Sequence, residues 1–258
     1  MNNLTVKGVY DWINTVAPFE TQEEFDNSGL QVGDPDSPVT NILLTLDVTG
    51  EVISEAVKLG SDLIISHHPL IFTPQKDMVL TRHVPKLLAG LIENKIALIS
   101  AHTNLDQSDQ YSGTVTTAKL LELKNIRRAS PYLFLGDLEK PVTDHELRKL
   151  ISANLKVPAR QYGQSDSLIR TLGIVGGAYS EGHEEARAAG AQAYLTGEVR
   201  HHHAVEANEA GFLVYDCGHY ATEFPMLESL AFGLQLMANE LKYNLQVHVS
   251  GSVPYRLE

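Results

Sequence analysis

Apolar runs alternate with amphipathic segments along the first half of the chain. The continuous apolar stretch 41–48 (NILLTLDV) predicts a buried strand, and 50–60 (GEVISEAVKLG) has the periodicity of a helix that ends at its last glycine. DLIISHH predicts the next strand, 83–95 a helix, and 96–106 (IALISAHTNLD) a strand that ends in polar residues. Strands that alternate with helices predict an α/β fold with a largely parallel sheet.

The second half of the chain repeats this order of elements. Residues 171–180 predict a strand, 181–190 a helix and 191–198 a strand. HHHAVEANEAG then predicts a helix, and 212–223 (FLVYDCGHYATE) predicts a strand with a polar end. The same succession of elements therefore occurs twice.

The two halves can be aligned on their glycines. Placing Gly60 on Gly190 superposes SDLIISHH on AQAYLTGE, and the later segments bring His102 onto His219. Shared α/β patterning produces part of such a match by chance. Even so, the alignment favours two similar α/β domains that arose by internal duplication.

A domain boundary is predicted near the middle of the chain. We expect a first α/β domain over 1–128 and a second over 129–223, with 224–258 packing back on the first. Thr143 and Glu146 have the spacing of a capping box and mark the first helix of the second domain.

Composition and charge narrow the functional classes. The chain has 258 residues, of which 43% are hydrophobic, and a formal net charge of −12. This charge disfavours direct binding to nucleic acid or to anionic membranes, and the basic cluster KNIRR (124–128) is predicted to be a solvated turn. A single cysteine, Cys217, excludes an intrachain disulfide and fits a buried strand position. With no signal-peptide pattern and no apolar run of about 20 residues, we expect a cytoplasmic protein.

Metal-capable side chains gather at four predicted strand ends, where ligands bind in open α/β sheets. HTNLD and HYATE each place a histidine four residues before a carboxylate, so the two side chains share one face if the segment is helical. A single such pair is more often structural than a ligand pair, but its repetition at strand ends favours a metal site. The groups are His67–His68, His102–Asp106, Glu198 with the run His201–His203, and His219–Glu223.

Histidines and carboxylates without thiolates suit Zn, Mn, Fe, Ni or Co. Five ligands exceed what one catalytic ion with open positions takes, and they suit two ions bridged by a carboxylate. Adjacent His67 and His68 point to opposite sides of a strand, so each can serve a different ion. In a helix, at most one residue of His201–His203 faces the site.

Six motifs together resemble the Nif3-like family, also called the GTP cyclohydrolase 1 type 2 homologue family. The resemblance extends from about residue 4 to the C-terminus and matches the short form without an inserted domain. Many members carry tryptophan where this chain has Phe25. The motifs are FDNSGLQVG (25–33), LDVT (46–49), SHHPLIF (66–72), AHTNLD (101–106), TGE (196–198) and GHYATE (218–223).

The resemblance implies two α/β domains with a dinuclear metal site in the cleft between them, and a ring-shaped homohexamer. It implies that His102 lies near the site, behind the ligands, and that Glu223 is the bridging ligand. The implied ligands are His67, His68, Asp106, His219 and Glu223.

These observations favour a metal-dependent hydrolase with two divalent ions per chain. A nucleotide or another phosphorylated, nitrogen-containing small molecule is the expected substrate, because the ions offset the negative charge of the chain. Glu198, Asp47 and His203 are expected to support the ligands or to transfer protons. The alternative hypothesis is a metal-binding regulatory or adaptor protein without catalysis. A third hypothesis is metal storage or delivery.

Overall fold

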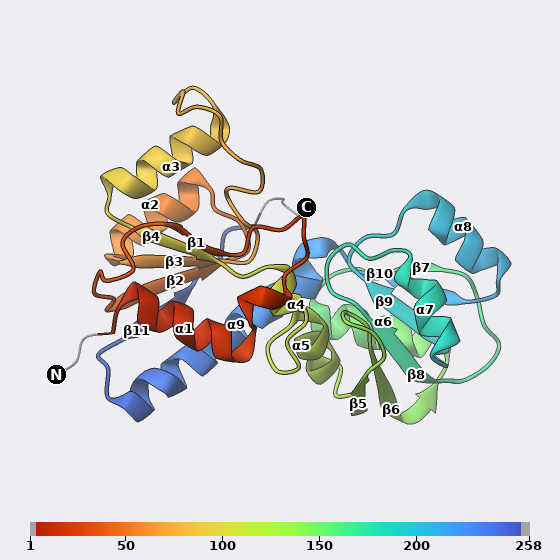
Figure 1. Ribbon diagram of the computed structural model, residues 1–258. Coiled ribbons are helices and arrows are strands. Elements are labelled where there is room, and N and C mark those ends of the chain that lie inside the picture. Colours follow the sequence, from red (N-terminus) through yellow and green to blue (C-terminus); the bar gives the residue numbers. More distant parts are fainter. Residues whose placement is uncertain (1–3, 254–258) are drawn as a thin grey trace. The chain divides into compact units, whose positions relative to one another are not determined.

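The computed structural model describes residues 4–253, which form two compact units of mixed α/β structure (Figure 1). Unit 1 contains the chain up to Ser108 and the chain from Leu227 onward. Unit 2 is Asp109–Met226. Each unit has its own sheet, so the predicted α/β class is confirmed.

Unit 1 is built on a five-stranded sheet in the order β1-β4-β3-β2-β11. Strands β4, β3, β2 and β11 are parallel, and β1 is antiparallel to β4. Parallel neighbours need a crossover connection, which is usually helical. The strands are β1 Gly29–Val32, β2 Asn41–Thr45, β3 Leu63–Ser66, β4 Ala97–Ser100 and β11 Gln246–Val249. The helices are α1 Val6–Val16, the 3₁₀ turn η1 Phe19–Thr21, α2 Gly50–Leu59, α3 His83–Glu93 and the short α4 Thr103–Asp106.

The local sequence explains how α2 begins and ends. The side chain of Thr49 accepts a hydrogen bond from the backbone N–H of Val52 and caps the first turn. Gly60 follows the helix with a φ of 67°, a left-handed conformation that glycine adopts at little cost. Helices α2 and α3 cover one face of the sheet and α1 the other, so the buried β2–β4 strands lie between two helical layers (Figure 1).

Unit 2 contains a six-stranded sheet in the order β5-β6-β8-β9-β10-β7. Strands β8, β9 and β10 are parallel, and the others pair antiparallel. The strands are β5 Lys124–Arg128, β6 Phe134–Val142, β7 Arg160–Tyr162, β8 Ile169–Ile174, β9 Ala193–Thr196 and β10 Leu213–Asp216. The helices of this unit are α5 Gly113–Leu120, α6 Asp144–Leu155, α7 Gly182–Ala188 and α8 His201–Glu209. Helix α9 His219–Leu241 begins in unit 2, and its residues from Leu227 onward belong to unit 1.

Helices cover both faces of the unit 2 sheet. Leu147 and Ile151 of α6 pack with Ala118 of α5 in one core cluster, and Ala186 of α7 packs with Ala207 of α8 in another. Thr143 and Glu146 form the predicted capping box at the start of α6.

The two units share the predicted succession of elements. Strands β2, β3 and β4 are neighbours and parallel, with α2 and α3 as crossovers. Strands β8, β9 and β10 have the same relation, with α7 and α8 as crossovers. Gly190 follows α7 with a φ of 92°, as Gly60 follows α2. Internal duplication itself stays a prediction.

The division between the units differs from the predicted boundary at 128. Residues 109–128 belong to unit 2, because α5 packs against β6 and β8 while β5 pairs with β6. The segment from Leu227 onward belongs to unit 1, where β11 pairs with β2. Helix α9 therefore contains residues of both units.

None of the helices within residues 4–253 is long and apolar enough to cross a membrane.

KNIRR is an edge strand, not the predicted solvated turn. As β5 it pairs with β6, which gives its exposed side chains specific partners. Arg127 forms an ion pair with Asp137 at 3.3 Å, and Arg128 one with Asp109 at 2.6 Å. The guanidinium carbon of Arg128 lies 4.6 Å from the centre of the Phe134 ring. Two of the three basic side chains of this segment, those of Arg127 and Arg128, therefore have acidic partners within unit 2.

Candidate metal centre

His67 and His68 directly follow β3. Their backbone N–H groups still bond to β2 and the residue after it, reaching the carbonyl oxygens of Thr45 at 3.0 Å and Leu46 at 2.9 Å. Nδ1 of His67 lies 2.9 Å from the carbonyl oxygen of Ala101. A carbonyl only accepts, so Nδ1 carries the proton and the lone pair of the neutral ring is on Nε2.

Nδ1 of His68 lies 2.9 Å from Oδ1 of Asp47. An ionised carboxylate also only accepts a hydrogen bond, so Nδ1 of His68 carries the proton and His68 has the same tautomer as His67. A carboxylate or carbonyl on the second ring nitrogen is the usual arrangement of a metal-binding histidine. Asp47, which we expected near the site, is thus in contact with the histidine that it would orient.

The His102–Asp106 pair does not share one helical face. His102 precedes α4 with φ −113° and ψ −104°, which is not helical, so the expected geometry of residues four apart does not apply. Its Nδ1 lies 2.9 Å from Oδ1 of Asp26. Oδ1 of Asp106, at the end of α4, lies 3.6 Å from Nε2 of His67. The carboxylate therefore joins His67 instead of His102.

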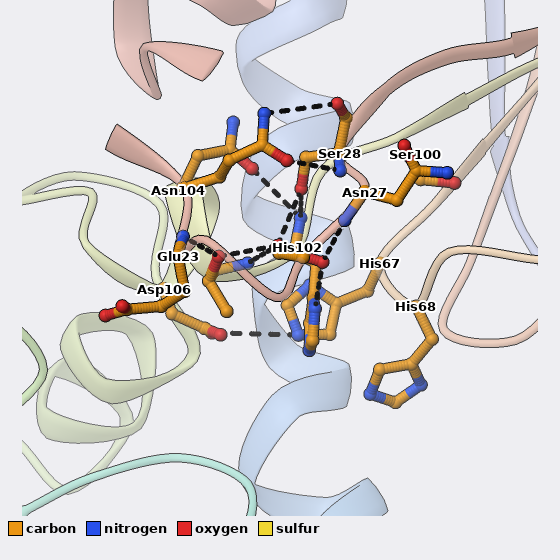
Figure 2. Close-up of polar contacts among 12 residues, drawn as sticks. Glu23, Asn27, Ser28, His67, His68, Ser100, His102, Asn104 and Asp106 are labelled. Carbon is orange, nitrogen blue, oxygen red and sulfur yellow. Dashed lines mark hydrogen bonds and ion pairs between the residues drawn. The ribbon is translucent and has the colours of Figure 1, made fainter. Parts of the chain in front are cut away.

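The three histidines of unit 1 form a cluster that can hold a metal ion. One ring nitrogen from each of His67, His68 and His102 lies within 4.8 Å of the other two. The centre of the His102 ring is 5.1 Å from that of His67 and 5.5 Å from that of His68 (Figure 2). His102 therefore has a donor atom in the same cluster, whereas the family resemblance placed it behind the ligands.

Asp26 is the residue of this site to which the sequence analysis assigned no role. Besides His102, its carboxylate accepts hydrogen bonds from the backbone N–H and the hydroxyl of Thr103 and from the hydroxyl of Ser28. Burial raises the pKa of Asp26, but the hydrogen bonds from His102 and Thr103 outweigh burial and hold the pKa well below its usual range. Asp26 is thus an anion that fixes His102 and the start of α4. Its place in the FDNSG motif was the available signal.

Unit 2 carries the second histidine–carboxylate pair at the start of α9. The strand predicted to reach 223 ends at Asp216, and the helix begins at His219. His219 and Glu223 therefore lie on one helical face, with Nε2 and Oε2 3.0 Å apart. Nδ1 of His219 lies 2.8 Å from Oε1 of Glu198. The carboxylate of Glu198 thus contacts Nδ1 of His219 in the same way that Asp47 contacts Nδ1 of His68.

His203 has different surroundings. It lies on α8, its Nδ1 bonds to the hydroxyl of Ser180, and its ring centre is 5.6 Å from that of His183. A proton-transfer role for His203 stays a prediction.

Two glycines allow backbone to pass close to the unit 2 pair. A Cβ on Gly177 would lie 2.2 Å from Oε1 of Glu223, and its φ of +67° disfavours any other residue. A Cβ on Gly197 would lie 2.8 Å from Cα of His219 and 2.6 Å from Oγ1 of Thr222. The glycines of GIVGGAY and TGE thus leave room for the carboxylate of Glu223 and the start of α9.

Gly177→Ala is expected to displace the carboxylate of Glu223 and to lower the metal content of the purified protein. The added methyl group would lie 2.2 Å from Oε1, too close for two non-bonded atoms, so the carboxylate must move from the position in which Oε2 lies 3.0 Å from Nε2 of His219. Elemental analysis after dialysis into metal-free buffer measures the effect.

Gly190→Ala is the matched control for this substitution. Gly190 also has a positive φ, of +92°, but a Cβ there would meet nothing within 4 Å. It carries a similar backbone strain without touching the site. Equal metal content in the two variants would show that the space at Gly177 is irrelevant to binding.

Comparison with known proteins decides the family. The family described as Duf34/NIF3 (NGG1p interacting factor 3) matches residues 4–254. The chain belongs to this family. A Nif3-family relative from Clostridium acetobutylicum, named GTP cyclohydrolase 1 type 2 homolog, is 30% identical over 257 residues and covers 96% of each chain.

Other Nif3-family relatives agree over most of their length. A Helicobacter pylori protein named GTP cyclohydrolase 1 type 2 is 30% identical over 228 residues, covering 84% of this chain and 86% of the relative. The crystal structure of a Staphylococcus aureus hypothetical protein has a TM-score of 0.92 and 28% identity, with all of both chains covered.

The side chains of this Nif3-family chain fit divalent transition metals. Unit 1 offers three imidazoles and the carboxylate of Asp106, and unit 2 offers the imidazole of His219 and the carboxylate of Glu223. Imidazole and carboxylate donors suit the Zn, Mn, Fe, Ni and Co ions expected from the sequence.

Proposed function

We propose that this protein is a metal-dependent hydrolase with a dinuclear centre, whose ligands are His67, His68, Asp106, His219 and Glu223, with Glu223 bridging. One observation carries the proposal. All three ligand histidines have Nδ1 held by an oxygen, of Ala101, Asp47 and Glu198 respectively, which leaves Nε2 as the donor atom. Histidines kept only for packing have no reason to share this orientation.

When bound, a pair of divalent cations supplies Lewis-acid activation of water and of the bond that is attacked. The remaining work falls to the protein side chains. Asp47 and Glu198 hold the rings of His68 and His219, and Asp26 holds His102 against His67 and His68. His102 is a positioning residue in this scheme, or a further donor of unit 1.

The substrate class is suggested by two exposed aromatic side chains beside the histidines. Phe25 and Phe72 are 63% and 45% exposed, and their ring centres are 6.3 Å apart. The Phe72 ring also lies 6.2 Å from that of His102. Exposed rings of this kind provide a stacking surface for a planar heterocycle. Together with cations that attract phosphate, they favour a nucleotide or a related phosphorylated, nitrogen-containing compound, as the GTP cyclohydrolase names of the relatives also suggest.

Phe72→Ala is expected to raise KM for a nucleotide substrate roughly 10-fold with little change in kcat, since stacking on an aromatic side chain contributes about 1–3 kcal/mol per base. Steady-state kinetics with the metal-loaded protein measures both constants. Met78→Ala removes an exposed apolar side chain a few residues further along the same loop and serves as control. An unchanged KM in Phe72→Ala would remove the stacking argument.

The decisive experiment is an unbiased activity screen with the metal-loaded protein, over nucleotides, phosphoesters and cyclic amides. The hydrolase proposal expects turnover that disappears on chelation and returns with metal. The description of the family as an interacting factor favours an adaptor as the second candidate. If the protein is an adaptor, we expect no turnover in the screen. We then also expect the wild type to capture a partner that His68→Ala and Glu223→Ala no longer bind.

Assembly and location remain proposals of the same kind. The family resemblance suggests a ring-shaped homohexamer, and the single cysteine, Cys217, fits a cytoplasmic location. Light scattering coupled to size-exclusion chromatography tests the assembly, and a mass of one or two chains would contradict it.

A further inference from the structure

Helices α7 and α8 of unit 2 frame a pocket that the proposed centre does not use. It has a volume of about 380 Å³, and its lining includes His183, Glu184, Arg187, Glu206 and Phe212. Phe212 precedes β10, whereas His219 follows the opposite end of that strand. The pocket and the proposed centre therefore have no residue in common.

Three side chains of this pocket bring metal-ligand atoms together. One ring nitrogen of His183 and one carboxylate oxygen each of Glu184 and Glu206 lie within 4.8 Å of one another. In the described part of the chain, neither glutamate forms an ion pair with a basic side chain. Two neighbouring carboxylates without such a partner repel each other, and a cation between them relieves the repulsion.

His183 is oriented in the way that metal-binding histidines are. It is only 4% exposed, and its Nδ1 lies 2.9 Å from the carbonyl oxygen of Ser180. The carbonyl accepts a hydrogen bond from Nδ1–H, so the lone pair of the neutral ring is on Nε2. The hydroxyl of the same buried serine bonds to Nδ1 of His203, which fixes the start of α8 beside His183. A buried imidazole with a fixed tautomer thus faces two carboxylates.

We propose that this pocket binds a single divalent cation through Nε2 of His183 and one oxygen each of Glu184 and Glu206. One imidazole and two carboxylates suit Zn²⁺, Co²⁺ or Ni²⁺ better than Mg²⁺ or Ca²⁺, which take oxygen ligands. The pocket is larger than one ion requires, so water or a small anion completes the coordination, and Arg187 on the pocket wall is placed to attract the anion.

Zinc stoichiometry of the full-length chain tests the proposal. Wild type and variants are dialysed against micromolar ZnCl₂, and bound zinc is measured by elemental analysis. Glu206→Gln and His183→Gln are each expected to bind one equivalent less than wild type. Glu206 is exposed, so its variant decides the outcome if the buried His183→Gln fails to fold.

Two control variants separate this site from general binding at the surface. Glu209→Gln removes an exposed carboxylate from the same helix, and His202→Gln shortens the histidine run. Both are expected to keep the wild-type stoichiometry. Unchanged zinc in Glu206→Gln would overturn the proposal, as would a crystal soaked in zinc without an anomalous peak between His183 and Glu206. Because no ligand is shared, loss of zinc from the proposed dinuclear centre leaves the difference between wild type and Glu206→Gln intact.

Discussion

His68→Ala is expected to release metal from the protein and to abolish metal-dependent turnover. The substitution removes the donor atom Nε2 and leaves Asp47 without the ring that it orients. Loss of an orienting partner alone costs roughly 10- to 100-fold in metal affinity, and loss of the ligand itself costs more. Competition with a chelating dye gives the affinity, and elemental analysis gives the stoichiometry.

Asp47→Ala distinguishes the contribution of the proposed ligand His68 from that of the carboxylate that orients it. Asp47 is half exposed, so its removal leaves the packing of unit 1 unchanged, while His68 keeps its imidazole but not its orientation. We expect an intermediate loss, of roughly 10- to 100-fold in affinity. His145→Ala, on the exposed face of α6, controls for the loss of any histidine. Wild-type affinity in His68→Ala would exclude this residue as a ligand and with it the proposed centre.

Leu98→Ala is expected to lower the free energy of unfolding of unit 1 by about 2–5 kcal/mol. Leu98 is fully buried in β4, between β1 and β3, and its side chain belongs to the core cluster beneath α2 and α3. Truncation leaves a cavity that neighbouring strands in a sheet fill poorly. Because β4 leads into His102 and α4, the histidine cluster of unit 1 is expected to be lost in the same transition.

Tryptophan fluorescence follows this transition, because the single tryptophan, Trp12, lies on α1 of unit 1. A unit-specific signal is needed, since two units can unfold in separate steps. Leu59→Ala makes the same change at a residue of α2 that is 37% exposed, and it is expected to cost less than about 0.5 kcal/mol. Equal costs for the two substitutions would contradict the assignment of Leu98 to the core.

Local patterns were sufficient for most of the helices and strands. The left-handed glycine after α2, the capping box of α6 and the apolar runs of β2, β3 and β4 depend on residues close together in the sequence, so their signals can be read directly. KNIRR was misread for the opposite reason. Its strand structure depends on pairing with β6 and on ion pairs to Asp109 and Asp137, and an exposed edge strand has no apolar periodicity of its own.

The two histidine–carboxylate pairs show the same limit at the site. Their spacing is identical, but HYATE begins helix α9, whereas His102 of HTNLD lies outside α4 and turns to Asp26. Spacing implies a shared face only where the backbone is helical. The backbone at His102 is set by contacts with residues far away in the chain.

The sequence by itself determined the α/β class, the family and the donor types, because each depends on residue identity and short-range order. Only the tertiary structure decided which oxygen holds each imidazole. The pairs Asp26–His102, Asp47–His68 and Glu198–His219 join residues far apart in the sequence. No periodicity records such a pair. Asp47–His68 and Glu198–His219 form because parallel strands bring their carboxyl ends, and the loops that follow them, to one edge of a sheet. Asp26 reaches His102 from just before β1, which is antiparallel to β4.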